Sequence, residues 1–144
     1  MEVIPGIGTD KIRFGITENE AISCLGAPDK TYTTDGGSKR LQFNLLCIEL
    51  SFEPENENRL GWIEIHNPEY LMGSRKLIGA SQQEVLSFVT ELLDEEPEIE
   101  DYGSFLSVSY DEHWVELQFQ FGRLDCINVG VLYDESEKPQ WPSS

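Results

Sequence analysis

Carboxylates are the most abundant side chains in this chain that could do chemistry, with 27 acidic and 10 basic residues among 144. Glu49 and Glu116 occupy matching places in two similar stretches, IELSF at 48–52 and VELQF at 115–119. Two such carboxylates facing each other across a groove could act as a general acid and a general base. A repeated sequence explains the same match without catalysis, so the residues alone leave both interpretations open.

The histidines and cysteines form no recognisable catalytic or metal-binding pattern. His66 is expected at a strand end and His113 in a tight turn, and the three cysteines lack CxxC spacing, which fits reduced thiols. Cys24 is expected in the core, on the apolar face of a helix. The chain has no nucleophile elbow, phosphate loop or HExxH sequence. We therefore expect no enzymatic activity, no catalytic residues, no metal and no cofactor.

The densest acidic segment follows the second predicted helix, at the end where the helix dipole is negative. Acidic side chains are locally unfavourable at this end of a helix, and a segment that is locally unfavourable is a candidate functional site. This segment could imitate a phosphate backbone for a basic partner. A solvated loop would tolerate the same acids, and the spacing lacks the order of a calcium loop. The acids of this segment are Asp94, Glu95, Glu96, Glu98, Glu100 and Asp101.

Net charge is −17, and residues 77–137 hold 15 of the acids and a single base, Arg123. Such a surface repels nucleic acid and anionic membranes and attracts cationic partners. A solvated face that merely promotes solubility is the competing explanation. The N-terminus carries acids and a proline in place of a signal peptide, so we expect a cytoplasmic protein.

The elements that must position these side chains occur twice. The pattern G-x-[ST]-x-x-E-[AV]-[IL]-S stands at 15–23 and at 79–87, and LGWIEI at 60–65 matches LDCINV at 124–129. A period of about 65 residues predicts two copies of one supersecondary unit, at about 11–66 and 75–133.

Each copy begins with a predicted helix. Thr17 and Ser81 are N-cap residues with Glu20 and Glu84 three positions later, which predicts two capping boxes. The helices are expected at about 18–25, where Gly-Ala-Pro follows, and at about 82–93.

After each helix the apolar period changes from 3.6 to 2, which indicates antiparallel strands with one face in the core. We expect an α+β fold in which two tandem helix-plus-meander repeats form one continuous antiparallel sheet of roughly six to eight strands. Both helices would pack on one face. The whole chain, 1–144, would be a single compact domain, and 134–144 would be a flexible tail in which Trp141 is either a docking anchor or simply exposed.

Alternation along the strands also predicts the face that the helices leave uncovered. It would carry Trp62 and Trp114 together with Glu49, Glu64 and Glu116. His66 and Cys126 are expected on the same face. Tryptophan is enriched at binding hot spots. Coverage of the two tryptophans by a loop or by the tail is the alternative.

The stretch Gly15-Ile16-Thr17-x-x-Glu20-Ala21, followed by Leu25-Gly26-x-Pro28-Asp29, resembles the opening of two families of small helix-plus-meander repeats. These are the SmpA/OmlA-type outer-membrane-assembly lipoproteins and the β-lactamase inhibitor protein family. The resemblance covers one copy well, and the second copy departs from it after its helix. The inhibitor family implies two tandem copies whose open sheet face binds another protein.

These features lead to the expectation of an acidic inhibitor that binds a protein, specifically an immunity protein that neutralises a basic, nuclease-type bacterial toxin. The two tryptophans would be anchors, and the acids named above would pair with basic residues. The alternative is a non-catalytic binding module that takes a small ligand or an assembly partner on the open sheet face.

Overall fold

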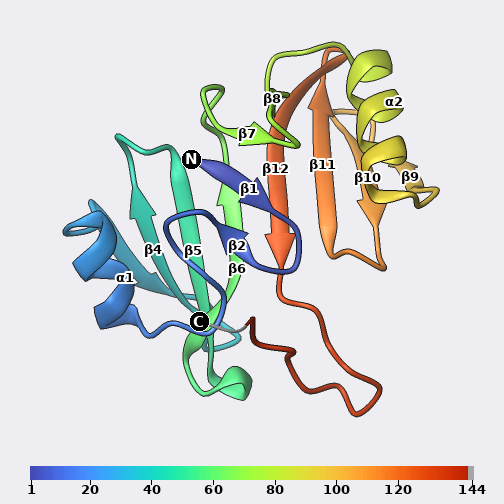
Figure 1. The fold of residues 1–144 in the computed structure, drawn as a ribbon. Helices are drawn as coiled ribbons and strands as arrows, with labels where there is room; N and C mark the ends of the chain where they lie inside the picture. Colours follow the sequence, from blue (N-terminus) through green and yellow to red (C-terminus); the bar gives the residue numbers. More distant parts are fainter. Residues whose placement is uncertain (143–144) are drawn as a thin grey trace.

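The computed structural model describes residues 1–142 and is mostly β, with two helices and two sheets (Figure 1). This agrees with the α+β class at the coarse level. Neither helix within the described residues is both long and apolar enough to cross a membrane.

Both helices have the predicted bounds, α1 at Glu18–Leu25 and α2 at Gln82–Leu93. Thr17 caps α1 in a complete capping box, in which the Glu20 carboxylate accepts from the Thr17 N–H. At α2 the Ser81 hydroxyl accepts from the Glu84 N–H at 3.3 Å. The reciprocal hydrogen bond of a capping box, from the N-cap N–H to the Glu84 carboxylate, is not formed. The prediction of two capping boxes was therefore right for the first helix and half right for the second.

The large sheet has eight strands in the order β3-β4-β5-β6-β12-β11-β10-β9, and every neighbouring pair is antiparallel. The first meander is β3 (Lys30–Thr33), β4 (Lys39–Phe43), β5 (Ile48–Glu53) and β6 (Arg59–Ile65), with the short 3-10 helix η1 (Pro54–Asn56) between the last two. The second is β9 (Glu98–Asp101), β10 (Leu106–Tyr110), β11 (Val115–Gln120) and β12 (Arg123–Gly130). The meanders meet where β6 pairs with β12.

A second, four-stranded sheet was not predicted, so the expectation of a single sheet was incomplete. It contains β1 (Glu2–Ile4), β2 (Gly8–Thr9), β7 (Leu71–Met72) and β8 (Arg75–Lys76), with β1 and β7 parallel. Its strands are only two or three residues long, too short to show an apolar alternation. In Figure 1 it lies between the two helices, in front of β5, β6 and β12.

One hydrophobic core joins these layers. The alternate residues of the large sheet pack with Ala21 of α1, Val85 and Val89 of α2, and Val3 and Met72 of the small sheet. Both helices and the small sheet therefore cover the same face of the eight-stranded sheet.

Each helix is attached to its meander by the same set of hydrogen bonds. Gly15 N donates to Leu60 O at 2.9 Å, and Gly79 N donates to Leu124 O at 2.8 Å. The guanidinium of Arg59 donates to Gly15 O at 2.8 Å, and that of Arg123 donates to Gly79 O at 2.9 Å. These bonds fix where each helix enters the core.

The described part of the C-terminal tail, 134–142, contacts the rest of the domain, and of the two alternatives for Trp141 the exposed one was wrong. The flexibility of the tail stays a prediction. Trp141 is partly buried against the core, and an added Cβ at Gly15 would lie 3.2 Å from its ring. The Gln140 N–H donates to Leu132 O at 2.7 Å. Residues 143–144 of the predicted tail lie outside the described residues.

Candidate functional site

The uncovered face of the large sheet is the candidate site, and strand register arranges its side chains in rows. The central row crosses seven strands from β4 to β9 and contains four glutamates. Its members in order are Gln42, Glu49, Glu64, Asn128, Glu116, Ser109 and Glu98.

The proposed pairing of Glu49 with Glu116 as acid and base is not formed. Strands β6 and β12 lie between their strands, which separates the two positions by about 14 Å at the usual strand spacing of about 4.8 Å. A catalytic carboxylate pair is far closer than this.

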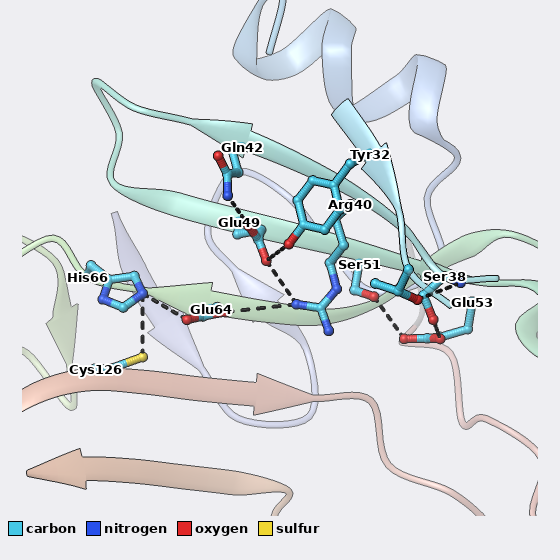
Figure 2. Close-up of polar contacts among 11 residues, drawn as sticks. Tyr32, Ser38, Arg40, Gln42, Glu49, Ser51, Glu53, Glu64, His66 and Cys126 are labelled. Atoms are coloured by element: carbon cyan, nitrogen blue, oxygen red, sulfur yellow. Dashed lines mark hydrogen bonds and ion pairs between the residues drawn. The ribbon is translucent and has the colours of Figure 1, made fainter. Parts of the chain in front are cut away.

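Glu49 is instead held inside a polar network (Figure 2). Its carboxylate accepts hydrogen bonds from Arg40 Nη1 at 2.9 Å, Gln42 Nε2 at 2.6 Å and Tyr32 Oη at 3.1 Å. Burial raises the pKa of Tyr32, and the hydrogen bond to Glu49 and the negative charge of that carboxylate raise it further. The Glu49 side chain is only 12% exposed, so little of it is accessible from solvent.

Arg40 also lies 3.8 Å from the Glu64 carboxylate. Glu49 and Glu64 are directly opposite each other on neighbouring strands, and like charges in that position destabilise a sheet. The guanidinium between them offsets this repulsion. The network lines a hollow of about 670 Å³, which also includes His66 and Cys47.

On the side of Glu64 away from Arg40, the side chains of Glu64, His66 and Cys126 come together. His66 Nε2 lies 2.9 Å from Glu64 Oε1 and 3.8 Å from the Cys126 sulfur (Figure 2). Contacts with Cys126 and then with Glu64 raise the pKa of His66 to about 10, and the hydrogen bond from His66 lowers the pKa of Glu64. Burial raises the pKa of the Cys126 thiol.

Sequence reasoning placed these three residues on the uncovered face but did not bring them together. Glu64 and His66 are two residues apart and so share a face. Cys126 joins them only because β12 pairs with β6 in this register. The expectation for Cys24 was wrong: Cys24 is exposed and Cys126 is the buried thiol.

Two tryptophans form an aromatic corner elsewhere on the same face. The rings of Trp62 and Trp114 meet edge to face with centroids 6.5 Å apart, and Tyr133 lies 5.3 Å from Trp114. Gly130 is directly opposite Trp62, and an added Cβ there would lie 2.7 Å from the Trp62 ring. Trp62 can therefore lie across β12 only because position 130 is glycine.

Trp114 does not belong to a strand, contrary to the prediction. It is a left-handed turn residue with φ of 51° just before β11, and its carbonyl accepts from the Gly130 N–H at 2.9 Å. Its side chain is 43% exposed. Glu116 and Asp111 line a small hollow of about 170 Å³ beside the two tryptophans.

The predicted acidic loop is divided by the structure. Its second half is the edge strand β9, where Glu98 and Glu100 pair with Ser109 and Ser107 and so lie on the uncovered face. Asp101, one residue on, belongs to the opposite side of β9.

The first half of the acidic segment has structural roles. Asp94 is the left-handed C-cap of α2. Glu95 is 10% exposed and bonds His113 Nδ1 at 2.8 Å and the Glu112 N–H at 3.1 Å. Glu96 is exposed in the connection that follows α2. Of the acids predicted to bind a partner, the structure thus places five on the uncovered face: Glu49, Glu64, Glu98, Glu100 and Glu116.

Comparisons with known proteins support the fold alone. No protein-family model and no curated protein sequence matches the chain. A solved extracellular protein from Bacillus anthracis that contains an SCP domain is 10% identical, with a TM-score of 0.55 over 90% of this chain. This chain spans 49% of that protein, about half its length. The DUF4309 family protein YjgB from Bacillus subtilis is 14% identical, with a TM-score of 0.53 over 88% of each chain.

Proposed function

We propose that this protein is a non-catalytic inhibitor that binds a basic protein on the uncovered face of its large sheet, most specifically an immunity protein for a nuclease-type bacterial toxin. The observation that carries the proposal is the aromatic corner of Trp62 and Trp114, which lies beside Glu116 on the polar face of the large sheet. Tyr133 packs against Trp114, which is still 43% exposed.

The chemistry of the corner favours a cationic side chain as its occupant. Tryptophan faces attract lysine and arginine within about 6 Å, and the attraction grows when the site is desolvated. Glu116 and Asp111 add negative charge at the same hollow. A partner's lysine or arginine inserted here would contact rings and carboxylates together.

The acids of the second meander favour fast association with such a partner. Glu116 accepts from Ser107 Oγ and Gln118 Nε2, and Glu100 accepts from Tyr102 Oη. These neutral partners leave the negative charge uncompensated. With a net charge of −17, the protein would attract a basic partner at long range, raising association rates to about 10⁸ M⁻¹s⁻¹ at low salt.

We also infer that the large sheet arose from two copies of one unit. Besides the matching helix attachments, the β5–β6 and β11–β12 pairs each carry a register shift at equivalent positions, at Ser51/Phe52 and at Gln118/Phe119. This inference agrees with the resemblance to the tandem β-lactamase inhibitor protein family, in which an open sheet face binds a protein. The free thiols of Cys24, Cys47 and Cys126 support a role in the reducing cytoplasm.

The test is co-expression with the product of the neighbouring gene, followed by measurement of affinity and of association rate across salt concentrations. Trp114→Ala should weaken binding by more than about 30-fold, the loss of a hot spot worth about 2 kcal/mol. Phe121→Ala removes a fully exposed aromatic from the β11–β12 turn and should leave affinity unchanged. Equal effects of the two variants would contradict the proposal, and an association rate unchanged by salt would remove its electrostatic part.

A small ligand in the hollow of the first meander is the second candidate. The hollow of about 670 Å³ has the size of a ligand pocket, and within the described chain the buried Arg40 Nε has no hydrogen-bond partner. A ligand oxygen could accept from it. In that case Arg40→Lys, which keeps the charge but removes this donor, should weaken binding, and Trp114→Ala should not.

A further inference from the structure

We propose that Glu64, His66 and Cys126 form a site for a divalent transition-metal ion of the zinc class. The site is separate from the aromatic corner, and the proposal does not depend on the protein-binding function. Ligand atoms of the three side chains lie within 4.8 Å of one another.

Strand geometry produces this convergence. Residues two apart on a strand share a face, so Glu64 and His66 project to the same side. The β6–β12 register pairs Ile65 with Ile127, which puts Cys126 directly opposite His66. The backbone therefore holds a carboxylate, an imidazole and a thiol around one point.

The separations are close to those of a zinc centre. Zinc binds sulfur at about 2.3 Å and nitrogen or oxygen at about 2.0–2.2 Å. Tetrahedral angles then place the sulfur and nitrogen about 3.5 Å apart, and the nitrogen and oxygen about 3.4 Å apart. The structure has 3.8 Å from Cys126 Sγ to His66 Nε2 and 2.9 Å from His66 Nε2 to Glu64 Oε1. Shifts of up to about half an ångström would bring these two separations to the tetrahedral values, and the sulfur and the Glu64 carboxylate lie within 4.8 Å of each other.

A catalytic relay of cysteine, histidine and glutamate does not fit these contacts. In a relay the histidine uses one ring nitrogen for the nucleophile and the other for the carboxylate. Here His66 Nε2 makes both contacts, and Cys126 is 1% exposed, out of reach of a substrate. Three donors that converge on one point are arranged for chelation.

The donor set selects the class of ion. Thiolate and imidazole favour zinc and related transition metals, whereas magnesium and calcium prefer oxygen donors. The His66 side chain is 46% exposed and lines the hollow of the first meander. A fourth ligand, from solvent or a bound molecule, could therefore approach from that side.

The first test uses Co²⁺ as a spectroscopic probe on the full-length, metal-free protein. We expect saturable binding of one ion per chain with a sulfur-to-cobalt charge-transfer absorption band, and displacement of that ion by Zn²⁺. Absence of a saturable one-to-one complex would overturn the proposal.

Variants identify the ligands. Cys126→Ser should abolish the charge-transfer band, and His66→Gln should weaken Co²⁺ binding by more than about tenfold, since even the loss of an outer-shell partner costs 10–100-fold. Cys24→Ser and Cys47→Ser, at the two exposed thiols, are the matched controls and should keep both band and affinity. A band that survives in Cys126→Ser, or disappears in Cys47→Ser, would refute this ligand set.

Thiol alkylation gives a measurement that needs no variant. Because Cys126 is 1% exposed, the labelling is followed in urea at concentrations that open the fold transiently. Bound Zn²⁺ should slow the labelling of Cys126 and leave the rate at the exposed Cys24 unchanged. Equal rates at Cys126 with and without Zn²⁺ would contradict the assignment.

Discussion

The two ends of the β6–β12 pairing carry different chemistry on the same backbone. At one end Trp62 lies opposite Gly130, whose N–H donates to the Trp114 carbonyl at 2.9 Å. At the other end Cys126 lies opposite His66, whose N–H donates to the Cys47 carbonyl, also at 2.9 Å. In the proposed duplication these positions are equivalent, since LGWIEIH at 60–66 aligns with LDCINVG at 124–130.

This difference shows which parts of the fold are free to vary. The helix attachments and core positions have the same form in both halves because they hold the sheet together. The uncovered face is free of that constraint, so one end has become aromatic, and the other has gathered a thiol, an imidazole and a carboxylate. The first three predictions below each compare a residue in one half with its counterpart in the other.

The largest effect is expected at the aromatic end. Gly130→Val places a side chain where a Cβ would lie 2.7 Å from the Trp62 ring, and such overpacking costs about 1–3 kcal/mol in the free energy of unfolding. His66→Val, at the equivalent and half-exposed position, creates no such overlap. It should cost less than about 1 kcal/mol at pH 10, where the stabilisation from the His66 proton is largely lost. Urea denaturation of both variants measures the difference. Equal losses would mean that the Trp62 ring does not depend on Gly130.

The next largest difference in stability is expected between the equivalent glutamates, Glu49 and Glu116. Glu49→Gln removes the charge that faces Arg40 and should cost about 1–2 kcal/mol of stability, because its side chain is 12% exposed. Glu116→Gln keeps contacts with neutral groups only and should cost less than about 0.5 kcal/mol. In partner binding the order reverses, with Glu116→Gln slowing association more than Glu49→Gln. Denaturation and association kinetics on the same two variants check both orders.

The helix caps provide a smaller contrast. Thr17→Ala should destabilise the protein by about 1 kcal/mol and Ser81→Ala by about 0.5 kcal/mol, because the capping box is complete only at α1. For the same reason Glu20→Ala should lower the melting temperature more than Glu84→Ala. Thermal unfolding of the four variants tests this, and a larger loss at α2 would contradict it.

The last contrast is a pH dependence at the thiol end of the metal-free protein. Cys126 and Glu64 raise the pKa of His66 from 6.5 to about 10, so the folded state holds this proton more tightly than the unfolded chain does. The resulting stabilisation is full below pH 6.5 and is lost as pH rises toward 10. The stability advantage of the wild type over His66→Gln should therefore shrink across that range. An advantage that grows with pH would refute the assignment.

Local signals in the sequence were enough to predict the helices. Capping residues and the Gly-Ala-Pro stop depend on near neighbours, so the bounds of α1 and α2 agree with the structure. The interior strands were predicted from their apolar alternation. The edge strands β3 and β9 were not predicted, because both are largely exposed and show no such alternation.

The missed features of the site depend on contacts between distant segments. Glu95 resembled its acidic neighbours, but its place beside His113 depends on how α2 meets the turn before β11. The meeting of Cys126 with His66 depends on the β6–β12 register. Trp141 packs on Gly15, 126 positions earlier in the chain. No local pattern encodes these contacts.

The central claim is that a protein partner covers the open face of the large sheet, and side-chain footprinting of the complex tests it most directly. Trp114 on the open face and Leu92 on the exposed side of α2 are both 43% exposed, so each serves as the other's control. Hydroxyl-radical labelling of the complex with the neighbouring gene's product should fall sharply at Trp114 and stay unchanged at Leu92. Protection of Leu92 with continued labelling of Trp114 would contradict the account.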